Sequence, residues 1–164
     1  MLRGGVVSPF TTIGSGSDTV GYWLGDIATN RLVVAPKSTE VKREWGSNTT
    51  VRGTTSTTNG LANTTTLFNL GAGAHPAAHY ARSLTTGGYT TWYLPAKDEL
   101  NTLYSNKSAT PFATANSFIG SNYMSSTENT GSFVWFQYFD GGYQNRYGGK
   151  GNPDNVRAIR RSTV

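Results

Sequence analysis

The last quarter of the chain repeats one pattern, in which short runs of aromatic and aliphatic residues alternate with turns rich in glycine and asparagine. The turns are Asn-Thr-Gly, Asp-Gly-Gly and Gly-Gly-Lys-Gly-Asn, whose residues readily adopt the φ angles that tight turns require. The pattern therefore predicts an antiparallel meander, with strands within residues 121–128, 132–139, 143–150 and 155–163. In Phe133–Phe139 both alternating faces carry large apolar groups, which predicts a central strand covered on two sides.

The first half of the chain carries one strand signal and two helix signals. Two apolar runs, Tyr22–Leu24 and Leu32–Ala35, flank polar turn residues and predict a hairpin. Residues 59–73 predict a helix of two or three turns that a glycine closes. Residues 75–84 predict a second helix, because a proline stands at an early position and apolar residues recur on one face.

Residues 90–100, with the sequence TTWYLPAKDEL, join a strand to a helix across a proline. A short strand is predicted at Thr91–Leu94, and a helix at residues 97–106. Asp98 and Glu99 lie in the first turn of this helix, where carboxylates interact favourably with exposed N–H groups and the helix dipole. Because helical neighbours point about 100° apart, we interpret the pair as a helix start and not as catalytic carboxylates that face each other across a cleft.

The order of these elements, strands followed by helices and then a meander, predicts the α+β fold class. A core is expected beneath the junction between the short strand and its helix. Trp92 and Leu94 alternate on one strand face, and Leu100 and Leu103 face back from the helix. Trp135 of the predicted central strand completes this core.

Composition and charge exclude several classes of protein. The chain has 164 residues, enough for one domain with a substantial core, and lacks cysteine, which excludes disulfides and thiolate metal sites. The net charge is +5, but the basic residues are scattered and only Arg157, Arg160 and Arg161 cluster, so we expect no nucleic-acid partner. No apolar run approaches the length of a membrane span or a signal peptide, so we expect no membrane insertion.

Residues that could bind a metal or act in catalysis are few and dispersed. Glu128, Asp140 and Asp154 cannot supply the roughly six to eight oxygen ligands of a calcium site. The two histidines are four residues apart, but a third zinc ligand and an HExxH pattern are missing. The Ser-Ser-Thr run before Glu128 has no recognisable His-Asp constellation. We therefore expect no catalytic residue, no metal, no cofactor and no enzyme activity.

Several segments together resemble a known family. GGYTTWYLPAKDELNTLY, YMSSTE, VWFQYFDGGYQ and the closing VRAIRR are similar to the C-type-lectin-like domain of the collagen-like bacterial adhesin C-terminal family, which also occurs in bacteriophage virion proteins. The resemblance covers roughly residues 20–163 and implies a C-type-lectin-like fold, with small antiparallel sheets flanked by two to three helices. The family usually has tryptophan at Met124 and a small hydroxyl residue at the predicted N-cap, Ala96. Loss of that hydroxyl is expected to cost about 1 kcal/mol.

Residues 133–151 are dense in tyrosine, asparagine, glycine and glutamine. This composition is typical of binding loops, because tyrosine supplies rigid contact area and asparagine supplies adaptable hydrogen bonds. The resemblance implies that this end of the domain is displayed, although the tyrosines could instead pack sheet or subunit contacts. Alternation places the odd-numbered residues within 143–147 on one strand face and Arg146 on the other. The predicted binding residues are Tyr138, Tyr143, Asn145, Arg146 and Tyr147.

The chain is predicted to have two parts, an N-terminal arm or attachment segment at residues 1–19 and the lectin-like domain at residues 20–164. The first functional hypothesis is a non-enzymatic bacteriophage structural protein, located in the virion as a capsid decoration or a tail-associated protein. Its expected partners are other virion proteins bound through the arm, a host-surface glycan or protein, and further copies of the chain in a homo-oligomer. The alternative hypothesis is a bacterial surface adhesin that binds a glycan or a protein.

Overall fold

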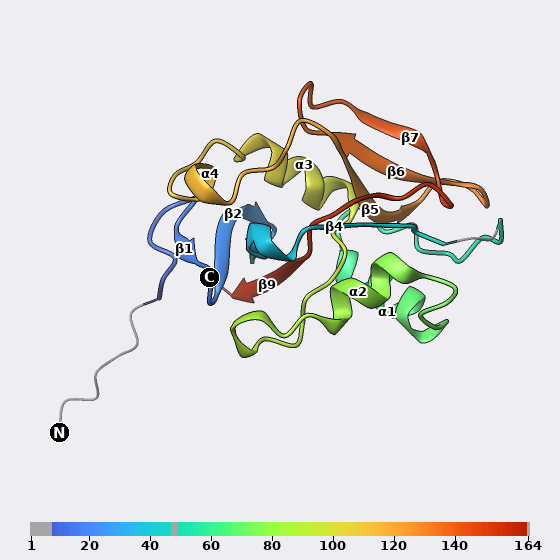
Figure 1. Ribbon diagram of the computed structural model, residues 1–164, viewed down its shortest axis with the longest axis horizontal. Helices are drawn as coiled ribbons and strands as arrows, with labels where there is room; N and C mark the ends of the chain where they lie inside the picture. Colours follow the sequence, from blue (N-terminus) through green and yellow to red (C-terminus); the bar gives the residue numbers. More distant parts are fainter. Residues whose placement is uncertain (1–7, 47–48, 164) are drawn as a thin grey trace.

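The computed structural model describes residues 8–46 and 49–163 of the chain. Within these residues two β-sheets, of four and five strands, combine with four α-helices (Figure 1). The two sheets occupy different halves of the molecule in this view, and two of the helices lie together along its lower side. The predicted α+β fold class is therefore confirmed.

The four-stranded sheet is antiparallel throughout. Its strands are β1 (Gly16–Ser17), β2 (Gly21–Ile27), β3 (Asn30–Val34) and β9 (Ile159–Thr163). They take the order β1-β2-β3-β9, and β2 with β3 is the hairpin predicted from the two apolar runs. β1 belongs to the predicted N-terminal arm, of which residues 1–7 lie outside the described residues. Phe10, also in that segment, is buried in the core.

The five-stranded sheet contains one parallel pair. Its strands are β4 (Val41–Arg43), β5 (Asn122–Glu128), β6 (Phe133–Tyr138), β7 (Gln144–Gly149) and β8 (Asp154–Val156). They take the order β4-β8-β5-β6-β7, in which β8 runs parallel to β5. The predicted meander is correct for β5, β6 and β7 but wrong for residues 155–163, which divide between β8 and β9. The buried guanidinium of Arg157 holds this crossing, because it donates to the main-chain carbonyls of Ala35 and Asn116.

Four α-helices pack against the sheets in the described part of the chain. They are α1 (Gly60–Asn69), α2 (Pro76–Ser83), α3 (Lys97–Ser105) and α4 (Phe112–Ala115), and two 3-10 helices span Lys37–Thr39 and Thr86–Gly88. α1 packs against α2, and α3 contacts β2 of one sheet and β5 and β6 of the other (Figure 1). The first three helices match the predictions. The sequence did not predict α4, because a single turn has no periodicity to detect.

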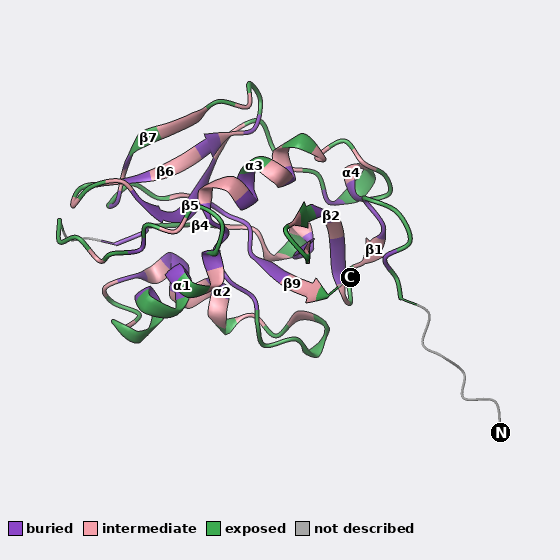
Figure 2. Ribbon diagram, turned by 180° about the vertical axis from the view of Figure 1, so that it is seen from behind, coloured by how far each residue is buried: buried purple, intermediate pink, exposed green. Residues whose placement is uncertain are grey.

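Two clusters of buried side chains form the core. Figure 2 colours the buried residues purple along the ribbon. One cluster contacts α1 and α2 and includes Trp92 and Leu94, and the other includes Leu100 and Leu103 of α3. These four predicted core residues have at most 1% of their surface exposed. The strand–helix junction therefore lies at the centre of the molecule, as predicted.

The prediction that Trp135 belongs to the core is wrong. Neighbouring strands cover both edges of β6, but Phe133, Trp135 and Phe136 each remain partly exposed. The ammonium group of Lys97 lies 4.9 Å from the centre of the Trp135 ring, which gives this indole a charged neighbour. In the sequence, apolar residues on both faces of a strand are found in strands that are buried on both sides and also in strands that leave aromatic rings exposed to solvent. The pattern alone therefore does not separate the two cases.

The predicted strand at residues 91–94 is reduced to a single bridge. Tyr93 exchanges both main-chain hydrogen bonds with Ile159, at 2.8 and 3.0 Å. Leu94 cannot extend the pairing, because its N–H donates to the hydroxyl of Thr64 at 3.0 Å and its carbonyl accepts from the same hydroxyl at 3.1 Å. A side chain of α1 thus takes the place of a strand partner.

Candidate functional site

The binding residues predicted from the sequence lie on β6, on the edge strand β7 and next to the turn between them (Figure 1). Tyr143 and Tyr147 are 56% and 58% exposed, Arg146 is exposed, and Tyr138 and Asn145 are half-buried. We call these five residues the tyrosine edge. Their predicted exposure is confirmed for the first three and is partial for the other two, and their role in binding stays a prediction.

A β-bulge in the tyrosine edge brings two side chains together. The register of β6 against β7 shifts between Val134 and Phe136, where β7 has one residue more than β6. This shift interrupts the alternation predicted from the sequence. Arg146 lies over the ring of Tyr147, and its Nη2 donates to the hydroxyl of Tyr147 at 2.9 Å. Asn145 fixes the backbone next to this pair, because its Oδ1 accepts a hydrogen bond from the main-chain N–H of Tyr147 at 2.8 Å.

A second ring supports each exposed tyrosine. Tyr147 meets Phe133 edge-on at 5.7 Å between ring centres, and Tyr143 meets Tyr138 at 5.2 Å. The glycine before Tyr143 has a φ of +79°, and a Cβ there would lie 2.4 Å from the ring of Tyr104, so the turn requires glycine. The rings are thus held in place while much of their surface stays exposed. Rings positioned in this way lose little conformational entropy when a partner binds.

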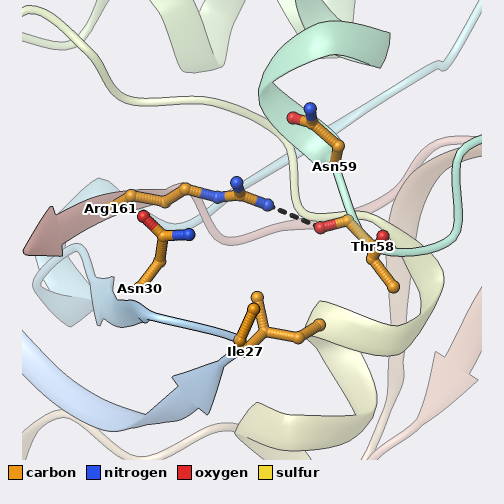
Figure 3. Close-up of a pocket in the computed structure, with 6 residues that line it drawn as sticks. Ile27, Asn30, Thr58, Asn59 and Arg161 are labelled. Carbon is orange, nitrogen blue, oxygen red and sulfur yellow. Dashed lines mark hydrogen bonds between the residues drawn. The ribbon is translucent and has the colours of Figure 1, made fainter.

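A pocket of about 350 Å³ lies elsewhere, between the β2–β3 hairpin, the start of α1 and β9 (Figure 3). The sequence did not predict it, because its walls come from three distant segments that share no motif. Arg161 extends from β9 across the pocket and donates through Nη2 to the carbonyl of Thr58. The residues that line the pocket are Ile27, Ala28, Asn30, Thr58, Asn59 and Arg161.

Glu99 is a fully buried carboxylate that binds Arg161. Its Oε1 lies 2.8 Å from Nη2 of Arg161 and accepts from the hydroxyl of Tyr93 at 2.9 Å. Its Oε2 accepts from the main-chain N–H groups of Ala96 at 2.8 Å and Gly60 at 3.1 Å. The interpretation of Glu99 as a helix-start residue is confirmed. The carboxylate also ties the starts of α1 and α3 to β9, a role that the sequence did not predict.

Burial and charge both act on the pKa values of this cluster. Burial raises the pKa of the Tyr93 hydroxyl, and the charge of Glu99 raises it further. Burial opposes the charge of Arg161, but its hydrogen bonds to Glu99 and Tyr93 outweigh this effect and raise its pKa. Tyr93 therefore stays neutral and Arg161 stays cationic at physiological pH.

The start of α3 has no side-chain cap, because Ala96 offers no acceptor. Tertiary contacts replace it. The N–H of Lys97 donates to the hydroxyl of Thr127 at 2.9 Å, and the N–H of Asp98 donates to the carbonyl of Thr57 at 2.8 Å. These bonds offset the expected loss from a missing capping hydroxyl. The side chain of Asp98 is 40% exposed and pairs with Lys97, as expected of a first-turn carboxylate.

The two histidines occupy separate environments. His75 is fully buried, and its Nδ1 lies 3.1 Å from the carbonyl oxygen of Trp45. His79 stacks on Phe68, and its Nε2 lies 2.9 Å from the carbonyl oxygen of that residue. Across residues 8–46 and 49–163, no three His, Asp or Glu side chains lie close enough together to hold a metal ion.

A second buried ion pair fixes the loop that precedes α1. Glu128 and Lys150 pair at 2.5 Å, and both side chains are almost fully buried. The carboxylate of Glu128 also accepts from the main-chain N–H groups of Arg52 and Gly53, at 2.9 to 3.0 Å. This carboxylate, weighed above as a calcium ligand, therefore has a structural role.

Comparison with known proteins places the chain in a family. Residues 34–160, well over half of the chain, match the family described as the Lcl C-terminal domain. The chain belongs to this family. The match includes the tyrosine edge of this Lcl C-terminal domain, whereas four of the six residues that line the pocket, Ile27, Ala28, Asn30 and Arg161, lie outside it.

The Lcl C-terminal domain also resembles a solved structure, a fimbrial protein from Bacteroides ovatus ATCC 8483. The TM-score is 0.59 at 16% sequence identity, and the likeness covers 79% of this chain and 35% of that chain. At this identity the likeness shows a shared fold, and the domain spans about a third of the fimbrial protein. No curated protein matches the chain.

The bacteriophage context of the first hypothesis finds no support in these comparisons. Within residues 8–46 and 49–163, no helix is long and apolar enough to cross a bilayer.

Proposed function

We propose that this Lcl C-terminal domain is a non-enzymatic binding module of a bacterial surface adhesin, and that the tyrosine edge contacts its glycan or protein partner. The observation that carries the proposal is the exposure of Tyr143 and Tyr147 on a hairpin that holds their rings in place. The matched Bacteroides structure is described as a fimbrial protein, which supports a location at the bacterial cell surface and favours the adhesin over the virion protein.

The chemistry of the tyrosine edge suits recognition of a surface. Tyrosine and arginine are enriched among the residues that dominate binding energies, because they combine large apolar area with hydrogen-bonding groups. Tyr143 and Tyr147 supply two such rings, and Arg146 places a cation beside the second ring. A partner that covers both rings would gain apolar contact, and the guanidinium and the hydroxyls would fix its orientation.

The described polar groups support a non-enzymatic role. The buried carboxylates Glu99 and Glu128 are engaged by cations and main-chain N–H groups. Each of the two histidines lies within hydrogen-bond distance of a main-chain carbonyl. These groups are therefore committed to the fold, which is unlike the free acid or base that general acid–base catalysis requires.

A triple variant tests the proposal. Tyr143→Ala, Arg146→Ala and Tyr147→Ala together remove exposed side chains, so the melting temperature should change little. Binding of the labelled domain to an array of purified glycans and extracellular-matrix proteins should weaken at least about tenfold. A control variant, Leu70→Ala with Arg82→Ala, removes an aliphatic and a cationic side chain near the ends of α1 and α2 and should bind like the wild type.

The same variant separates a partner surface from a subunit interface. Analytical ultracentrifugation should show the same oligomeric state for the wild type and the triple variant. A triple variant that folds and binds normally would refute the proposal. A triple variant that becomes monomeric while its binding is intact would assign the tyrosine edge to contacts between copies of the chain.

A further inference from the structure

The pocket beside Arg161 is separate from the tyrosine edge and has no role in the proposed adhesion. Its walls come from the β2–β3 hairpin, the residues before α1 and β9. Figure 3 shows Arg161 crossing the pocket towards Thr58, with Asn30 on one side of the guanidinium and Asn59 on the other. At about 350 Å³ it lies within the usual range of small-molecule sites.

The lining offers hydrogen-bond donors to an anion and presents no carboxylate side chain to a cation. Arg161 is the one formally charged residue among the six that line the pocket, and the polar remainder consists of two carboxamides and a hydroxyl. The nearby carboxylate of Glu99 is fully buried, and both of its oxygens accept hydrogen bonds from the protein. Because the ion pair with Glu99 offsets much of the charge of Arg161, the guanidinium acts on a ligand chiefly as a fixed hydrogen-bond donor at short range.

One nitrogen of the Arg161 guanidinium, Nη1, is available to bind a ligand. Its Nε and Nη2 are engaged by Glu99, and Nη2 also donates to the carbonyl of Thr58. Nη1 has no hydrogen-bond partner among the described residues. The protein therefore fixes the position of the guanidinium and leaves two N–H donors on Nη1. An oxygen of a carboxylate can accept from them.

The rest of the lining fits an uncharged body that carries polar groups. Ile27 and Ala28 supply an apolar wall, while the carboxamides of Asn30 and Asn59 can each donate and accept hydrogen bonds. Ala28 has a φ of +51°, at a hairpin position where glycine is usual. Such strain is unfavourable for alanine and often persists where a structure holds a ligand site.

We propose that this pocket binds a small carboxylate, with the carboxylate on Nη1 of Arg161 and a hydroxyl- or amide-bearing body between Asn30, Asn59 and Ile27. Two sources offer this chemistry, an acidic sugar and the terminal carboxylate of a peptide. D-glucuronate represents the first source and N-acetylglycine represents the second. D-glucose is the matched neutral compound, because it has the same ring as glucuronate without the carboxylate.

Two isosteric substitutions test the site without removing Arg161, whose loss would also strand Glu99. Asn30→Asp places a negative charge in the lining, and no described residue hydrogen-bonds the side chain that it replaces. Asn59→Asp does the same at the N-cap of α1, where the Asn59 side chain accepts from the N–H of Ala62 and aspartate caps equally well. Asn101→Asp is the matched control, because Asn101 does not line the pocket and aspartate can still accept the hydrogen bond that its Oδ1 accepts from Gln137 of β6.

The measurement is the change of backbone amide NMR signals on titration of the full chain with each compound. We expect glucuronate, N-acetylglycine or both to shift residues 27–30 and 58–60 saturably, and glucose to bind at least tenfold more weakly. Asn30→Asp and Asn59→Asp should each weaken carboxylate binding at least tenfold, and Asn101→Asp should not. The compound that binds more tightly identifies the source of the carboxylate.

Three results would overturn the proposal. One is the absence of saturable shifts with either carboxylate at 50 mM, and another is binding of glucose as tight as that of glucuronate. The third is carboxylate binding that Asn30→Asp and Asn59→Asp leave unchanged. None of these results bears on the tyrosine edge, so the adhesin proposal stands or falls separately.

Discussion

Replacing Glu99 with alanine is predicted to lower the unfolding free energy by about 3–5 kcal/mol, the usual effect of removing one partner from a buried ion pair. Arg161 is partly exposed and can turn to water, so most of the effect comes from the donors that stay buried. These are the hydroxyl of Tyr93 and the N–H groups of Ala96 and Gly60. Each unsatisfied buried donor costs about 1–3 kcal/mol, and three at the lower end of that range give a similar figure.

Thermal unfolding followed by circular dichroism measures this effect. For a domain of this size, 3–5 kcal/mol corresponds to a fall in melting temperature of roughly 6–20 °C. Asp98→Ala is the matched control, because it removes the neighbouring carboxylate, which is 40% exposed and pairs with Lys97 at the surface. Its effect should stay below about 1 kcal/mol. Equal effects of the two substitutions would refute the role assigned to Glu99.

His75 should make the domain less stable in mild acid. Burial, together with the charges of Arg52 and Lys150, lowers its pKa, although Glu128 and the carbonyl of Trp45 act in the opposite direction. The stability that neutral His75 contributes is therefore present above its unfolded-state pKa of about 6.5 and is lost as the pH falls below that value. The urea midpoint should fall between pH 7 and pH 5, and His75→Gln should reduce the fall; equal slopes for both proteins would contradict this. Trp92→Ala should cost about 3–5 kcal/mol, and Trp135→Ala roughly half as much or less because its ring is half-buried. Equal losses in urea denaturation would contradict the burial of the two rings.

The sequence predicts those elements that short-range physics determines. The hairpin and the first three helices follow from turn residues, a proline at an early helical position and apolar periodicity, all of which act over a few residues. The predictions fail where a distant group decides the outcome. Thr64 takes both main-chain groups of Leu94 and prevents a longer strand there. Arg157 holds the chain between β8 and β9 through carbonyls of two other segments.

The candidate sites show the same division. The tyrosine edge lies within residues 138–147, and its local composition predicts the exposure of Tyr143, Arg146 and Tyr147. The bulge beside Arg146 requires the pairing of two strands. The pocket brings residues 27–30 together with Asn59 and Arg161, and no local pattern indicates that they meet. Glu99 is similar, because its place in the helix start is visible in the sequence but its pairing with Arg161, 62 residues away, is not.

The central claim is that the tyrosine edge contacts the partner, and tyrosine-selective iodination read by mass spectrometry tests it most directly. In the free domain Tyr143 and Tyr147 should react, while the buried Tyr93 and Tyr123 should not. When the domain is bound to the glycan or matrix protein that it retains on the array, both exposed tyrosines should be protected from iodination. If Tyr143 and Tyr147 react as fast in the bound domain as in the free one, the partner binds elsewhere and the claim is wrong.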